Sequence, residues 1–167
     1  MAEWDGTLPT LLAGEVPDGD KFAILLDVLA ALTGPWDSFT PTITASGTAF
    51  AAGNSTLVGA YKQVGKFVVA KARVTIGNSG VTVGSGTYNF ALPPVAPLAA
   101  SNSVGSAYFR DASATSTGHF PGISVVDAAL STTVLNCYNV NQSLGAAFPF
   151  AVAASDHFSW AIMYEAA

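Results

Sequence analysis

Apolar and polar residues alternate with a period of two along most of the chain after Thr40, a pattern typical of half-buried β-strands. The alternation is clearest in residues 66–76, 87–92 and 158–164. The residues on the apolar side are Val68, Ala70, Ala72, Val74 and Ile76 in the first segment, Tyr88, Phe90 and Leu92 in the second, and Phe158, Trp160, Ile162 and Tyr164 in the third. We therefore expect each segment to turn one face toward a shared core.

Weaker strand patterns occupy residues 42–46, 55–64, 104–110, 122–128 and 131–138. Turn-forming Gly, Asn and Pro residues separate the strands, as in residues 77–80 and 84–86. Short alternating strands with such turns predict a mostly β fold, namely an antiparallel β-sandwich (jelly-roll-like). The pattern does not determine the order of the strands.

A different pattern precedes the strands. Residues 1 to about 18 hold four Gly and Pro residues and predict an extended arm. One short apolar α-helix follows, which Asp18 or Asp20 can cap and Gly34-Pro35 ends. Its large apolar residues at helical spacing are Phe22, Leu25, Leu26, Leu29 and Leu32. The helix has almost no polar face, so we expect it to be buried on several sides, against symmetry-related copies or a larger host.

These patterns divide the chain into two parts. Residues 1–35 are the arm and helix, which we expect to serve attachment or oligomerisation, and residues 36–167 are the β-sandwich domain. Trp36 follows the helix directly and is predicted to anchor the junction between them.

The composition points to assembly. Half of the 167 residues are apolar and only 10% are charged, against roughly 25% in ordinary soluble domains. We expect partners to cover part of so weakly charged a surface. The net charge of −5 and the scattered basic residues argue against nucleic-acid or anionic-membrane partners. The first residues show no signal-peptide pattern and no apolar run is long enough to span a bilayer, so we expect synthesis in a cytoplasm.

The sequence offers little catalytic chemistry, and we expect no enzyme activity, cofactor or metal. His119 and His157 are the only histidines, although a two-histidine site at a trimer axis stays open. There is no GxSxG elbow, phosphate loop or suggestive carboxylate pair, and single Cys137 excludes an intrachain disulfide. Two loops, 77–86 and 112–121, are the candidates for ligand contacts. Their candidate contact residues are Asn78, Ser79, Ser85 and His119, and the last lies in a loop by composition.

Five short motifs follow one another along the chain. They are WDSFTPT at 36–42, GNSTLVGAY at 53–61, VGKFVV at 64–69, GSGTYNFALP at 84–93 and WAIMYEAA at 160–167. This series resembles small virion proteins of tailed phages that infect actinobacteria, and the helix resembles the segment by which such proteins attach. Proteins of this kind are minor tail or tail-fibre-like proteins, and similar sandwiches decorate phage heads. The alanine-rich surface departs from that family and favours a structural role over a receptor-binding role.

The resemblance implies a non-enzymatic structural protein on the surface of the virion, made in the host bacterial cytoplasm. A minor tail or tail-fibre-like protein that contacts the host is the first interpretation, and a capsid decoration protein is the alternative. A stand-alone carbohydrate-binding module is a third. The expected partners are further copies in a homotrimer, a tail or major capsid protein, and a cell-wall glycan of the host.

Overall fold

The computed structural model describes residues 19–98, 103–114, 117–127, 132–137 and 142–167, with only the backbone for 127 and 132–137. These residues form one helix and ten strands. The elements are α1 (Gly19–Thr33), β1 (Asp37–Phe39), β2 (Ile43–Ala45), β3 (Thr56–Val64), β4 (Phe67–Thr75), β5 (Tyr88–Ala91), β6 (Val104–Arg110), β7 (His119–Asp127), β8 (Thr132–Cys137), β9 (Gln142–Ser143) and β10 (His157–Glu165).

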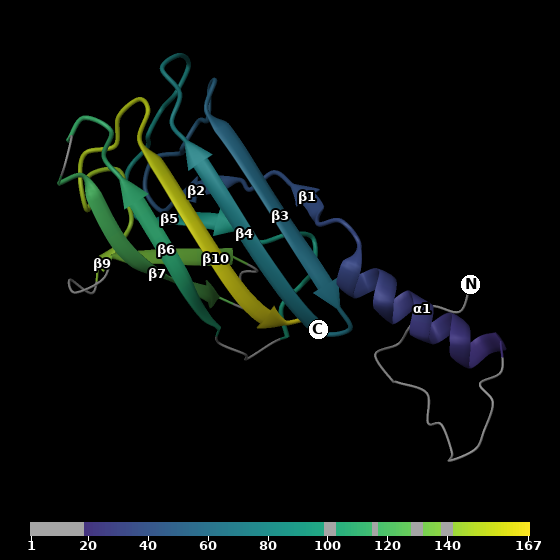
Figure 1. Cartoon of the computed structure of the whole chain (residues 1–167). Helices are drawn as coiled ribbons and strands as arrows, with labels where there is room; N and C mark the ends of the chain where they lie inside the picture. Colours follow the sequence, from purple (N-terminus) through teal and green to yellow (C-terminus); the bar gives the residue numbers. More distant parts are fainter. Residues whose placement is uncertain (1–18, 99–102, 115–116, 128–131, 138–141) are drawn as a thin grey trace.

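The strands form two layers that are joined at one edge. The first layer has six strands in the order β1-β3-β4-β10-β6-β7. At its edge β7 also pairs with β8, and the ladder continues through β5 to β2, which lie behind the first layer (Figure 1). The short β9 pairs with β8. The pairings between these strands are antiparallel, and the predicted antiparallel β-sandwich class is confirmed.

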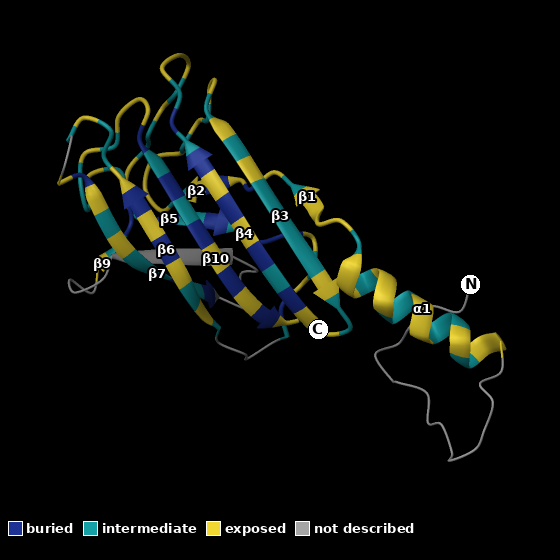
Figure 2. Ribbon diagram, viewed as in Figure 1, coloured by how far each residue is buried: buried dark blue, intermediate teal, exposed yellow. Residues whose placement is uncertain are grey.

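The core lies between the two layers. All twelve apolar positions predicted from the period-two pattern are buried, including Trp160. Aromatic contacts join the layers, because Tyr88 of β5 lies 6.4 Å from Phe158 of β10 between ring centroids. Alternate residues of β4 and β10 are buried along their whole length (Figure 2). The alternation in the sequence therefore correctly predicts which face of each of these strands turns inward.

Two buried tyrosines tie loops to this core. The hydroxyl of Tyr88 donates to the carbonyl of Val83 at 2.6 Å, and that of Tyr164 donates to the carbonyl of Val95 at 2.9 Å. Burial raises the pKa of each tyrosine to about 12. Both hydroxyls therefore stay protonated and keep donating at any pH near neutrality.

Helix α1 has the predicted bounds but projects from the sandwich (Figure 1). It ends where the amide of Gly34 donates to the carbonyl of Ala30 at 2.7 Å. A β-carbon on residue 34 would lie 2.7 Å from that same oxygen, so the helix end requires glycine there. None of the fifteen helical residues is buried within the single chain. The prediction that the helix is buried on several sides concerns an assembly, and it stays a prediction.

The weaker strand patterns correspond to β2, β3, β6, β7 and β8, whose bounds differ from prediction by three residues at most. Two short strands, β1 and β9, were not predicted. The placement of His119 in a loop was wrong, because His119 is the first residue of β7 and pairs with Arg110 of β6. Cross-strand pairing along β6 here outweighs the turn-forming composition of residues 117–122.

Candidate functional site

Helix α1 exposes a continuous apolar surface. We call Phe22, Leu25, Leu26, Leu29 and Leu32 the helix stripe; their side chains are 37–61% exposed. At about 100° per residue these five positions fall within an arc of about 120°, the width of a helix face that normally packs on a core. Figure 2 shows the helix standing apart from the sandwich, with its residues coloured exposed or intermediate and none buried.

The junction between helix and sandwich is fixed by two lysines. The ammonium of Lys62 in β3 donates to the carbonyls of Gly34 and Pro35 at 2.7 and 3.3 Å, where the helix leaves carbonyl groups without partners. The ammonium of Lys71 in β4 lies 4.5 Å from the ring centroid of Trp36, a cation–π contact. The side chain of Trp36 is 45% exposed, and its predicted role as the anchor of the junction stays a prediction.

A second uncovered surface is the outward face of the six-stranded layer. We call it the outer sheet face and define its apolar members as Val58, Phe67, Val104, Tyr108 and Met163, which are 36–63% exposed. They come from β3, β4, β6 and β10, at positions that alternate with core residues. The helix stripe, Trp36 and the outer sheet face together account for the large exposed apolar side chains of the described residues.

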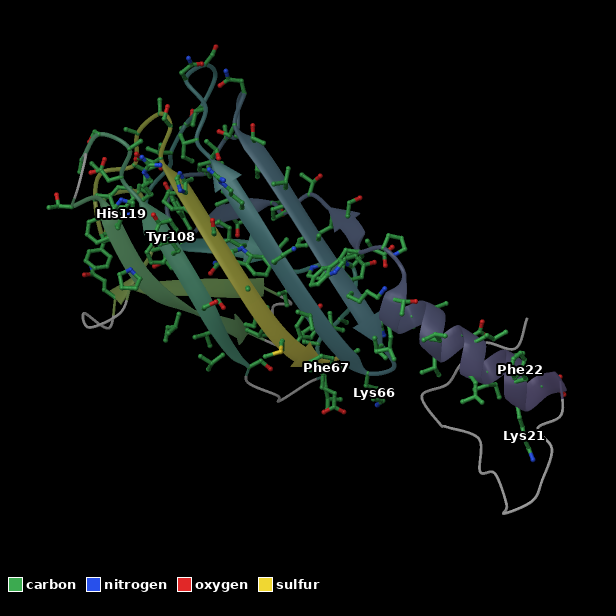
Figure 3. The ribbon with its side chains drawn as sticks, viewed as in Figure 1. Lys21, Phe22, Lys66, Phe67, Tyr108 and His119 are labelled. Atoms are coloured by element: carbon green, nitrogen blue, oxygen red, sulfur yellow. The ribbon has the colours of Figure 1, made fainter. Side chains whose placement is uncertain are left out.

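Two shallow hollows lie on the outer sheet face. One, of about 350 Å³, is bordered by Val58, Ala60, Lys71, Arg73 and Ser159 among others. The second, of about 430 Å³, lies toward the end of the strands nearer the helix and is lined by Lys66, Phe67, Met163, Tyr164 and Glu165. Figure 3 shows Phe67 and Lys66 at this end and Tyr108 at the opposite end. Side chains of another molecule can therefore sink into the face at two places.

A cluster of polar rings lies at the opposite end of the outer sheet face. The hydroxyl of Tyr108 and Nδ1 of His119 share a hydrogen bond (Figure 3), and the Tyr108 ring lies 5.9 Å from the His157 ring between centroids. Burial, and then the charges of Arg73 and Arg110, lower the pKa of His157 below its ordinary value. The neutral form of this histidine is therefore favoured at neutral pH.

The residues predicted to contact a ligand in loop 77–86 make hydrogen bonds that hold neighbouring turns together. The side-chain oxygen of Asn78 accepts from the Asn54 amide at 2.9 Å, and the backbone amide of Ser79 donates to the Asn54 side chain at 2.9 Å. The hydroxyl of Ser85 accepts from the backbone amide of Thr48 at 2.9 Å. The register brings this loop and the β6–β7 connection to one end of the sandwich, because His157 pairs with both Thr75 and Arg110. Loop 77–86 and the β6–β7 connection thus lie at the same end as the ring cluster, but the Asn78 and Ser85 side chains already bond within the chain.

Sequence reasoning singled out the helix stripe but missed the outer sheet face. The alternation assigned Lys71 and Arg73 to the outward side of 66–76, yet Phe67, Val104 and Met163 were not noticed as outward residues. The signal was present in the sequence. An apolar residue out of phase with the core positions of its strand must point outward, as Met163 does between Ile162 and Tyr164.

In the described part of the chain, no three His, Cys, Asp or Glu side chains gather closely enough to hold a metal ion. The helix that the structure describes is too short to cross a membrane. Cys137 lies in β8, and its side chain falls outside the described residues.

Comparison with known proteins gives no relative: no family model, no curated protein and no solved structure matches this chain.

Proposed function

We propose that this chain is a non-enzymatic structural protein of a tailed-phage virion, exposed on the particle and anchored through its N-terminal arm and helix α1. The observation that carries the proposal is the helix stripe, five large apolar side chains on a helix with no buried residue. Soluble monomers rarely expose a continuous apolar surface of this kind, whereas a subunit of an assembly buries it against its partners.

The energetics favour repeated contacts over a single one. Burying the exposed half of a Leu or Phe side chain contributes about 1 kcal/mol, so the helix stripe contributes about 5 kcal/mol per chain. Association costs roughly 4–15 kcal/mol in lost freedom of motion. One stripe is therefore marginal alone, and closure of several copies around an axis makes the assembly stable. A homotrimer is the proposed form.

The virion assignment rests on the motif resemblance, which includes the WDSFTPT segment at the helix–sandwich junction. A minor tail or tail-fibre-like role places the ring cluster, loop 77–86 and the β6–β7 connection outward, at the end of the sandwich away from the helix, in contact with the host. Capsid decoration is the second candidate, and the outer sheet face favours it because a flat apolar face suits lateral packing.

A stand-alone carbohydrate-binding module has less support. Sugar platforms need exposed aromatic rings, but Trp160 is buried and the ring of Trp36 is occupied by Lys71. Tyr108 is the remaining exposed aromatic ring at the loop end among those described, and it is bonded to His119.

The test combines location with helix variants. Antibody raised against residues 36–167 should label purified phage particles, at the tail tip for a tail protein or over the head for a decoration protein. Leu25→Gln, Leu29→Gln and Leu32→Gln together, or deletion of residues 1–35, should abolish incorporation while the sandwich still folds.

The matched control carries Ala30→Gln, an exposed helical position outside the helix stripe, and should incorporate normally. Particles that neither bind the antibody nor contain a detectable copy of the chain would refute the virion assignment. Normal incorporation of the stripe variant would refute the anchor role of α1.

A further inference from the structure

The chain carries two uncovered apolar surfaces that do not meet within one molecule. Helix α1 leaves the sandwich beyond β3, and Lys62 holds its end in that place. Figure 3 shows Phe22 of the helix stripe far from Phe67 of the outer sheet face. The helix stripe therefore cannot cover the outer sheet face of its own chain while the Lys62 contacts persist.

The two surfaces match in size. Fifteen helical residues extend about 22 Å, and the nine-residue strands β3, β4 and β10 extend about 30 Å. A helix about 10 Å wide covers two neighbouring strands spaced about 4.8 Å apart. A helix laid on a sheet is also the usual way in which a sheet with one bare apolar face is buried.

The charges of the two parts are complementary. Helix α1 holds two acidic residues, Asp20 and Asp27, and one basic residue, Lys21, so it carries a net charge of −1. The outer sheet face carries three cations, Lys71, Arg73 and Arg110, and one acid, Glu165, and no salt bridge engages the three cations within the described residues. The helix is therefore weakly negative and the face weakly positive, and opposite net charges favour their association.

From these matches we propose that the helix stripe of one copy packs on the outer sheet face of a neighbouring copy. This inference rests on the proposed function, because it names the surface that receives the anchoring helix. The contact is head-to-tail: each copy donates one helix and receives another, and three copies close a ring in which both surfaces are buried. The hollow lined by Phe67 and Met163 receives side chains of the incoming helix.

Cross-linking between single-cysteine variants tests the arrangement. In a Cys137→Ser background, Leu29→Cys places a thiol on the helix stripe and Met163→Cys places one on the outer sheet face. The two full-length variants are mixed, allowed to exchange and treated with a short bismaleimide. We expect cross-links between Leu29→Cys and Met163→Cys chains, which differential tagging identifies, and few between chains of the same variant.

Each other outcome overturns the inference. Cross-links confined to Leu29→Cys with itself mean a bundle of helices at the axis. Cross-links confined to Met163→Cys with itself mean a sheet-to-sheet contact. Both a bundle and a chain that stays monomeric at all concentrations refute this arrangement but leave the proposed anchoring by α1 standing, because only normal incorporation of the stripe variant refutes that anchoring.

A second measurement uses charge. Met163→Glu should raise the dissociation constant of self-association by about tenfold or more, because it places a carboxylate in an apolar contact. Ala147→Glu, an exposed site outside the outer sheet face, is the matched control and should leave association unchanged. Equal association of the two variants by light scattering would overturn the assignment of the receiving surface.

Discussion

At the scale of single residues, Asp156 shows how one carboxylate organises a loop end of the sandwich. Its side chain is fully buried just before β10. One oxygen accepts from the backbone amide of Ala112 at 2.8 Å and the other from the amide of Ala153 at 2.7 Å. The carboxylate therefore joins the segment after β6 to the turn before β10, although the two are 44 residues apart in the sequence.

Asp156→Asn should destabilise the sandwich. The amide nitrogen that replaces one carboxylate oxygen would face a backbone donor, leaving a buried group unsatisfied. We expect the free energy of unfolding to fall by about 2–3 kcal/mol. Urea denaturation followed by tryptophan fluorescence measures it. Asp111→Asn is the matched control: that carboxyl is exposed, bonds to Ser113 two residues away, and should change stability little.

His157 makes stability depend on pH in a direction set by its environment. Burial and the charges of Arg73 and Arg110 lower its pKa in the folded chain. The unfolded chain therefore binds the proton first as pH falls below about 6.5, and this favours unfolding. Between about pH 7 and pH 5, wild type should lose more stability than His157→Gln. Parallel curves for the two proteins would contradict the assignment.

The cause of that lowered pKa has its own test. Removing one positive neighbour by Arg73→Ala should raise the pKa of His157 toward its ordinary value, as followed by the imidazole proton signals in NMR titration. Lys66→Ala removes a charge that does not contribute to the shift, so the pKa of His157 should stay unchanged.

At the scale of elements, the junction of α1 depends on one ammonium group. Lys62→Met removes the donor to the carbonyls of Gly34 and Pro35 and the positive charge at the helix end. We expect local stability at the junction to fall by about 1 kcal/mol. Amide hydrogen exchange should accelerate in residues 29–35 while the core of β4 stays protected. Lys66→Met, in the turn between β3 and β4, should leave exchange in the helix unchanged.

Elements with a long apolar period were predictable from the sequence, and others were not. The alternation in 66–76 and 158–164 identified β4 and β10. Each strand has nine residues, and every second one is buried in the core and is therefore apolar. Strand β1 has three residues and β9 has two, too few for a period to appear. The helix was visible for the same reason as the long strands, since its spacing and its Gly34-Pro35 stop agree.

The candidate surfaces were predictable only in part. A sequence pattern shows which residues of a strand share a face, but not which strands lie next to each other. The helix stripe is local in sequence, so its five members were found together. The outer sheet face joins Val58, Phe67, Val104, Tyr108 and Met163 from four strands. Their adjacency depends on the order β3-β4-β10-β6, which the sequence pattern does not contain.

At the scale of the whole molecule, assembly should appear as stability that depends on concentration. Helix α1 adds no buried residue to the single chain, so residues 36–167 alone should unfold much as the diluted full chain does. The melting temperature of the full chain should rise with protein concentration, because association stabilises the folded state by mass action. That of residues 36–167 should stay constant. Differential scanning calorimetry over a hundredfold concentration range compares the two.

The position of β10 has a consequence for synthesis of the protein. This strand follows the other nine in sequence yet lies in the middle of the layer, with β4 on one side and β6 on the other. While the ribosome makes the chain, α1 emerges early, but the outer sheet face cannot exist until residues 157–165 are released. In the proposed ring, a chain cut short by premature termination would offer a helix to a neighbour and have no surface to receive one. Such a fragment would leave the ring open, so a complete ring forms only from chains that have released residues 157–165.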